Sequence, residues 1–220
     1  MNQALFVATA LALASGTGAA GVSEPCAGRH GPLAPNDPRL REWFRALAHE
    51  VAREEGIDPY ALEALGMTET TLRPWLGRSC EVGAFQVMPW WAGIFRLDPP
   101  ELLWDPRINA IAAARIYKDA WRRWDERYAH AGNNRALRAA GWRGKLDRAT
   151  FAALTYNWGK APAVFAQASD LRKVAIPASV AAYARRFSLA LRDARGRARA
   201  DNDTPRGRSP RSRAGATRES

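Results

Sequence analysis

The stretch DPYALEALGMTETTLRPWLGRSCEVGAFQVMP, residues 58–89, decides the fold and the candidate chemistry of this chain. It begins with Asp58 followed by a proline, the pattern of a capping side chain before the first residue of a helix. Leu62 and Leu65 then share one helix face with Glu69, because spacings of three, four and seven return to the same side. The sequence therefore predicts a helix that carries an acidic residue on its apolar face.

The same Asp-Pro pattern recurs at 37–38 and 105–106, each time before apolar residues spaced for one helix face. Two further helices are predicted, one over Asp147 to about Asn157 and one that begins near Pro177. No segment alternates between apolar and polar residues with a period of two. The sequence predicts an all-α domain, or an α domain with one very small β hairpin.

The chain is strongly basic, with 33 Lys and Arg against 22 Asp and Glu among 220 residues. Such a charge favours anionic surroundings: cell-wall polymer, nucleic acid or a membrane surface. The positive charge is diffuse and no nucleic-acid-binding motif accompanies it, which argues against a nucleic-acid-binding protein. No apolar run reaches the roughly 18 residues of a membrane span, so none is expected in the mature chain.

The N-terminus has the pattern of a signal peptide over residues 1–20. The apolar run ALFVATALALA is followed by small residues, with cleavage expected after Ala20. No Lys or Arg precedes the run, so an N-terminal membrane anchor is the alternative. Export predicts a periplasmic or secreted protein. In an oxidising compartment the two cysteines, Cys26 and Cys80, predict one disulfide.

The remaining organisation follows from composition. Residues 21–36 are expected to be an N-terminal extension, 37–191 the globular domain, and 192–220 a disordered basic tail with almost no large apolar side chain. The domain is expected to be monomeric. No cofactor is expected. A metal site is not expected either, because the histidines show no ligand spacing and are interpreted as surface residues: His30, His49 and His130.

Glu69 is the residue that most needs explanation. On an apolar helix face, an ionised carboxylate is costly to desolvate, so its pKa should rise. A general acid that works near neutral pH needs such a pKa. Spacing alone is equally compatible with a frayed helix end whose carboxylate points into solvent.

Motifs in a fixed order favour the catalytic interpretation. TET at 68–70, GAFQVMP at 83–89 and YNWG at 156–159 follow one another, with GIDPYALEAL before them and DPRINAIAAARIY between. Over roughly residues 45–190, the chain resembles the lytic transglycosylase SLT family, which is related to goose-type lysozyme. The resemblance implies a lysozyme-like helical domain with a cleft.

The resemblance also implies roles for individual residues. Glu69 matches the catalytic acid of the family. The expected substrate-binding residues are Thr70, Gly83, Gln86, Met88, Tyr156, Asn157 and Tyr183. The chain departs from the family pattern in three places. Thr70 and Thr71 stand where a serine and a small residue are usual, Cys80-Glu81 replaces a Gly-Ala pair, and 121–148 is longer than the usual connection. This longer segment is interpreted as an added helical hairpin at one edge of the cleft.

The tryptophans divide into two groups. Trp43, Trp121 and Trp124 fall on helix faces and are predicted to lie in the core. A second group adjoins the motifs, and one of its members is a candidate for stacking on a sugar: Trp90, Trp91 and Trp158.

The reaction implied by the resemblance is cleavage of the peptidoglycan glycan strand at the MurNAc-GlcNAc bond. Glu69 would protonate the glycosidic oxygen and then act as base on the 6-hydroxyl of the sugar, which gives a 1,6-anhydro end. A second carboxyl group, which most glycosidases need, is hard to find. Glu81 is the only acidic residue in the loop near Gly83, and it is interpreted as an exposed loop charge rather than a second catalytic carboxyl group.

Three alternatives stay open: a hydrolytic muramidase on the same fold, a non-catalytic wall-binding protein, and a protein that docks on a secretion or conjugation machine. An acid at position 69 argues against both non-catalytic alternatives. As an enzyme, the protein would serve either general wall remodelling or such a machine.

Overall fold

The computed structural model describes residues 36–77, 79–97, 100–125, 147–167 and 175–203. Most of these residues are helical, and they contain no sheet, so the predicted all-α class is confirmed. The expected signal peptide, Cys26, His30, His130, most of the 121–148 segment and residues 204–220 lie outside the described ranges.

The principal helices begin where the sequence predicts, because capping side chains fix their first turns. They are α2 (Pro38–Glu55), α3 (Pro59–Glu69), α5 (Pro106–Arg123), α7 (Arg148–Asn157) and α9 (Ala178–Asp203). An aspartate carboxylate accepts a hydrogen bond from a backbone N–H in the first turn of α2, α3, α5 and α7. Three shorter elements were not predicted: α4 (Trp90–Ile94), the 3-10 turn η1 (Pro100–Trp104) and α8 (Ala161–Gln167).

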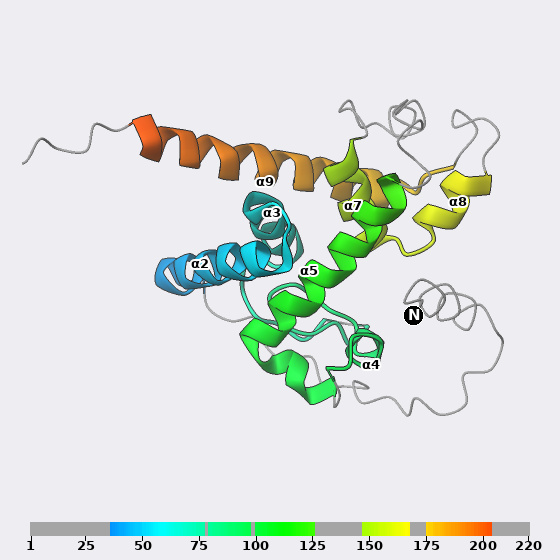
Figure 1. The fold of residues 1–220 in the computed structure, drawn as a ribbon, viewed down its shortest axis with the longest axis horizontal. Coiled ribbons are helices and arrows are strands. Elements are labelled where there is room, and N and C mark those ends of the chain that lie inside the picture. Colours follow the sequence, from blue (N-terminus) through cyan, green and yellow to red (C-terminus); the bar gives the residue numbers. More distant parts are fainter. Residues whose placement is uncertain (1–35, 78, 98–99, 126–146, 168–174, 204–220) are drawn as a thin grey trace, which may run out of the picture.

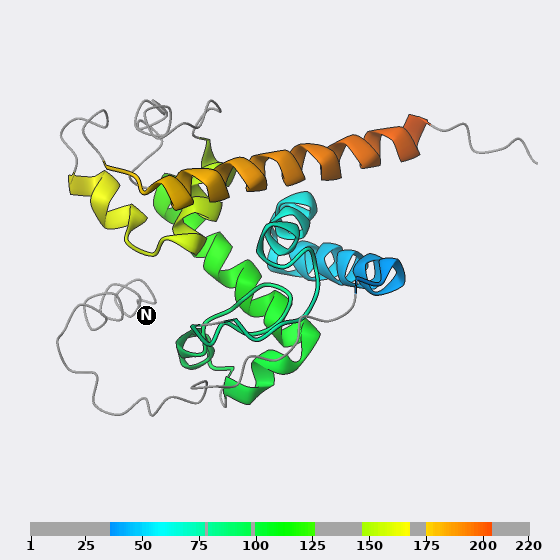
Figure 2. The same ribbon diagram turned by 180° about the vertical axis from the view of Figure 1, so that it is seen from behind.

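Helix α3 is the central element of the fold. It packs between α2 and α9, while α5 crosses below and connects α2 with α7 (Figures 1 and 2). Six consecutive residues of α3, 61–66, are buried, as expected for a helix enclosed on most sides. The C-terminal end of α3 therefore carries Glu69 from the core to the surface of the bundle.

The segment between α3 and α4 contains no regular strand. Only isolated antiparallel bridges occur in the described part of it, Leu76 with Val82 and Val82 with Val87. In place of the very small hairpin that the sequence allowed, the described residues form isolated pairs of bridging residues. Gly66 lets this segment pack closely on α3, because a Cβ there would collide with the side chains of Leu72 and Phe85.

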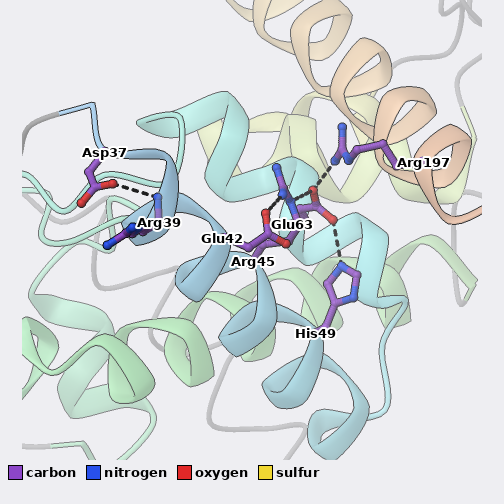
Figure 3. Close-up of polar contacts among 7 residues, drawn as sticks. All are labelled: Asp37, Arg39, Glu42, Arg45, His49, Glu63 and Arg197. Atoms are coloured by element: carbon purple, nitrogen blue, oxygen red, sulfur yellow. Dashed lines mark hydrogen bonds and ion pairs between the residues drawn. The ribbon is translucent and has the colours of Figure 1, made fainter. Parts of the chain in front are cut away.

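A buried ion cluster joins α2, α3 and α9 (Figure 3). Glu63 is 1% exposed, and its two oxygens lie 2.7 Å from Nε of Arg45 and 2.8 Å from Nε2 of His49. Arg197 of α9 pairs with the same carboxylate. Burial raises the pKa of Glu63, but these partners together lower it below its usual value. His49 is therefore a partner of a buried carboxylate, which corrects its interpretation as a lone surface residue.

The C-terminal boundary of the globular domain is also corrected. The sequence placed a disordered tail over 192–220, but α9 continues to Asp203. Leu191 and Ala194 are buried, and Arg195 pairs with Asp58 of the α3 cap at 2.6 Å. The arginine-rich sequence did not reveal this extension, because Ala194 is the one side chain between residues 192 and 200 that is buried.

The predicted core is otherwise largely correct, with one clear exception. Trp124 is 7% exposed and Trp121 is partly buried against the core. Trp43 is 51% exposed, and its ring packs edge-on against the ring of Phe44. The neighbouring Phe44 points inward in its place. Among the described helices, none is long and apolar enough to cross a membrane.

Candidate active site

Glu69 is the last residue of α3, and its side chain is partly exposed. Its carboxylate accepts a hydrogen bond of 2.6 Å from the hydroxyl of Tyr183, which is 2% exposed on α9. Burial and the charge of Glu69 raise the pKa of Tyr183 well above its usual value, so this hydroxyl remains a donor. The structure thus brings together two predicted site residues from opposite ends of the domain.

The pKa of Glu69 is raised to about 7. Burial is the largest cause, and the negative charge of Glu81 acts in the same direction. The hydrogen bond from Tyr183 and the charge of Arg186 lower the pKa but do not offset burial. A carboxyl group with this pKa is present in both protonation states near neutral pH. A residue that first donates a proton and then accepts one needs this property.

Thr70 holds the chain that leaves α3, and its hydroxyl is fully used in doing so. It is buried, donates to the carbonyl of Ala84 at 2.7 Å and accepts from the backbone N–H of Arg73 at 3.0 Å. The next two residues, Thr71 and Leu72, both have φ of 58°. These hydrogen bonds give Thr70 a role in fixing this turn beside Glu69, and its expected contact with substrate stays a prediction.

Gly83 owes its identity to a buried asparagine. Its φ is 80°, and a Cβ at this position would lie 2.5 Å from Oδ1 of Asn109. Asn109 is 2% exposed on α5. Its Oδ1 accepts from the N–H of Phe85 at 3.1 Å, and its Nδ2 donates to the carbonyl of Val82 at 2.9 Å. Gly83 makes room for the side chain that holds the loop, and its expected close approach to the sugar stays a prediction.

Gln86 is held in the same loop. Its Nε2 donates to the carbonyls of Trp75 at 3.0 Å and Gly83 at 2.8 Å. Its Oε1 lies beside Gly77, where a Cβ would collide with it and with the carboxylate of Glu81. The amide nitrogen of Gln86 therefore holds the loop through two hydrogen bonds, while its oxygen lies near Gly77 and the carboxylate of Glu81.

Tyr156 connects this loop to α7. Its hydroxyl donates to the carbonyl of Phe85 at 2.6 Å. Its pKa is raised well above the usual value, first by burial and then by the charge of Glu69. Asn157, the next residue, is exposed, and Met88 is partly buried. Tyr156 and Tyr183 are thus grouped with Glu69, whereas Asn157 faces solvent.

Glu81 is the second carboxyl group near Glu69. It is partly buried, and its Oε2 accepts from the N–H of Ser79 at 2.9 Å. Its charge acts on Glu69 strongly enough to raise the pKa of that residue. Glu81 is therefore part of the electrostatic surroundings of the acid rather than an isolated loop charge.

The tryptophans near the motifs differ in accessibility. Trp90 is 59% exposed, whereas Trp91 stacks on Phe95 with ring centroids 5.4 Å apart. Trp158 is partly buried against the cluster that contains Phe151. Of the three, Trp90 offers the most open ring face for stacking on a sugar.

Two other features bear on the site. Cys80 is not a free thiol; Cys26 lies outside the described residues, so the Cys26–Cys80 pairing stays a prediction. A hollow of about 490 Å³ lies elsewhere, and none of the predicted site residues lines it. Its walls include Arg148, whose guanidinium covers the ring of Trp121, and several of its charged groups pair with one another.

Asn109 is the residue that sequence reasoning missed. It stands inside the quoted motif DPRINAIAAARIY, but no role was assigned to it. The available signal was an amide on the inward face of an otherwise apolar helix, because a buried amide must find hydrogen-bond partners. Those partners are the backbone of the loop that follows Glu69.

Comparison with known proteins gave no match to a family model and no match to a curated protein.

Proposed function

We propose that this chain is an exported peptidoglycan lytic transglycosylase that cleaves the MurNAc-GlcNAc bond with Glu69 as its single proton-transfer residue. The observation that carries the proposal is the environment of Glu69. Its pKa is about 7, its carboxylate is held by Tyr183, and it still reaches solvent at the end of α3. A general acid–base residue at neutral pH needs all three properties.

The proposed reaction has two steps at one carboxyl group. Protonated Glu69 donates its proton to the glycosidic oxygen as the bond to the muramyl C1 breaks. The N-acetyl group of the muramyl residue stabilises the positive charge that develops there, an arrangement that replaces the second carboxylate of most glycosidases. The Glu69 carboxylate then removes the proton of the 6-hydroxyl, whose oxygen bonds to C1. The products are a free GlcNAc 4-hydroxyl and a 1,6-anhydro-muramyl end.

Tyr183 supports both steps in this scheme. Its hydrogen bond fixes one carboxylate oxygen, which leaves the other oxygen for the substrate. Since the bond also stabilises the ionised form, Glu69 becomes a better acid than burial alone would allow. The loop fixed by Thr70 and Asn109 would form the wall beside the acid.

One observation favours a second candidate, a hydrolytic muramidase. The charge of Glu81 raises the pKa of Glu69, so a second carboxylate lies within electrostatic range. In a hydrolase, such a group would activate water or attack the sugar. We favour the transglycosylase because Glu81 already accepts a backbone hydrogen bond from Ser79 within its own loop.

The experiment that separates the candidates is mass spectrometry of the digest. Purified protein is incubated with peptidoglycan sacculi, and the soluble fragments are analysed. An anhydro end is lighter by one water than a reducing end. Anhydro ends support the proposal, reducing ends favour the hydrolase, and binding without release favours a wall-binding protein.

A further inference from the structure

Arg186 lies one turn after Tyr183 on α9, at the edge of the candidate active site. Its guanidinium carbon is 5.6 Å from the centroid of the Tyr183 ring. The hydroxyl of that ring donates to Glu69 at 2.6 Å. The three side chains therefore form a row that begins at the partly exposed acid and ends at an exposed cation.

Arg186 differs from the arginines farther along the same helix. Arg195 and Arg197 pair with Asp58 and Glu63, and both pairs hold α9 on α3. Arg186 is exposed, and it forms no ion pair with any residue that the structure describes. Its positive charge nevertheless reaches Glu69 and lowers the pKa of that carboxyl group. The structure of the described domain therefore gives Arg186 no bridging role.

A bound substrate would place its own polar groups beside Glu69, Tyr183 and Arg186. The glycosidic oxygen must come within hydrogen-bond distance of Glu69, about 3 Å, for proton transfer. A side arm on the adjoining sugar can then extend over Tyr183 to the guanidinium. In peptidoglycan this arm is the lactyl group of the muramyl residue. It carries a stem peptide with free carboxylates, or ends in its own carboxylate once the peptide has been removed.

We infer that Arg186 binds a carboxylate of the muramyl side arm and thereby makes the site selective for acidic glycan strands; this inference rests on the proposed function. A guanidinium is suited to the task because it is always charged and can hold a carboxylate through two parallel N–H donors. The ring of Tyr183 lies below the guanidinium and restricts its position.

The test compares Arg186→Gln with a matched control, Arg185→Gln, which removes the same charge from the preceding residue of α9. Three soluble substrates are used: native peptide-bearing strands, the same strands with their carboxylates amidated by carbodiimide and methylamine, and amidase-treated strands with a free lactyl carboxylate. Turnover is measured by kcat/KM. Binding is measured by calorimetry in a Glu69→Gln background, which keeps the strands intact.

The expected result is a loss of about tenfold in kcat/KM and in affinity on native strands for Arg186→Gln. The amidated strands should show no difference between Arg186→Gln and the parent chain, and Arg185→Gln should match the parent on every substrate. If the loss persists on amidase-treated strands, the bound group is the lactyl carboxylate; if it disappears there, the bound group belongs to the stem peptide. Either outcome supports the inference.

Two outcomes would overturn it. An equal loss on native and amidated strands would mean that Arg186 acts on Glu69 or on the fold, and no loss on either would mean that it binds nothing. The binding measurement separates this inference from the proposed function. Affinity that depends on Arg186, in a chain that cleaves no strand, would retain the carboxylate site and reject the enzyme. Cleavage of strands by the parent chain, with an affinity that does not depend on Arg186, would retain the enzyme and reject the carboxylate site.

Discussion

Tyr183 and Glu69 are 114 residues apart in sequence, yet the tyrosine hydroxyl donates a hydrogen bond of 2.6 Å to the carboxylate. Helix α9 brings the tyrosine across α3 to the point where α3 ends. The bond opposes the effect of burial on Glu69 and so helps to keep its pKa near 7 rather than higher. The two helices together adjust the acid to neutral pH.

Replacement of Tyr183 by phenylalanine should therefore move the pH dependence of activity. Without the hydroxyl, the ionised form of Glu69 loses a charged hydrogen bond, and its pKa should rise by about one pH unit. The limb of the pH profile that reports Glu69 should shift upward by the same amount. The control is Tyr117→Phe, which removes a buried hydroxyl bonded to the carbonyl of Ala149. It should lower stability without moving the profile; an unshifted Tyr183→Phe profile would contradict the role given to this bond.

The raised pKa of Glu69 also predicts how stability depends on pH. Because the folded pKa is about 7 and the ordinary value is 4.5, the folded protein binds this proton more tightly than the unfolded chain. Its contribution to stability is complete below about pH 4.5 and is lost as the pH rises through 7. The two pKa values correspond to about 3 kcal/mol as an upper limit.

Glu69→Gln removes this dependence while it keeps the shape of the side chain. We expect the variant to match the wild type near pH 4 and to be more stable above pH 7.5. Chemical denaturation at several pH values measures the difference. Glu101→Gln, at an exposed position, should follow the wild type throughout. A constant difference between Glu69→Gln and the wild type at all pH values would show that Glu69 is not titrating in this range.

Gly83 and Asn109 should behave as a coupled pair. Gly83→Ala places a methyl group 2.5 Å from Oδ1 of Asn109 and forces a φ of 80° on alanine, so we expect a loss of about 2 kcal/mol or more. Gly93→Ala is the matched control, since nothing lies within 4 Å and the position is helical. It should be neutral or slightly stabilising. In the double variant Gly83→Ala/Asn109→Ala, the loss should be smaller than the sum of the single losses, because the clash is gone.

A pair of truncations tests the position of the C-terminal boundary. A chain that stops after Leu191 loses the ion pairs of Arg195 and Arg197 and the buried Ala194. Glu63 then keeps only its partners on α2, and we expect a loss of about 2 kcal/mol, limited by the exposure of both arginines. A chain that stops after Asp203 keeps all these contacts and should have the same melting temperature as the full-length protein. Equal melting temperatures for the two truncations would mean that residues 192–203 add no stability.

The sequence was most informative where local chemistry determines structure. Asp37, Asp58, Asp105 and Asp147 begin helices because a capping carboxylate next to the first turn needs no distant partner. The place of Glu69 on an apolar helix face could be predicted from spacing, but its interpretation as an acid also depended on the motifs around it. The end of α9 could not be found in this way, since Arg195 and Arg197 look like solvated charges until Asp58 and Glu63 are brought beside them.

The same distinction applies to the site. Motif matching selected Thr70, Gly83 and Gln86, and all three lie in the loop after Glu69. Each has a structural role: Thr70 and Gln86 form hydrogen bonds to the carbonyls of Ala84 and Trp75, and Gly83 leaves space for the side chain of Asn109. No spacing rule reveals such long-range contacts. Motif matching therefore could not identify which residues of this segment support the loop.

The proposed chemistry rests on Glu69, and paired substitutions of the two carboxyl groups test it. Glu69→Gln keeps the hydrogen bond from Tyr183 but cannot give or take the proton, and loss of general acid–base catalysis costs about 10²–10⁴-fold. Since one group serves both steps, release of fragments from sacculi should fall to background. Glu81→Gln removes a negative charge that raises the pKa of Glu69, so this variant should remain active with its pH profile shifted downward. Inactivity of both variants, together with reducing ends in the wild-type digest, would reject the transglycosylase and establish a site with two catalytic carboxylates.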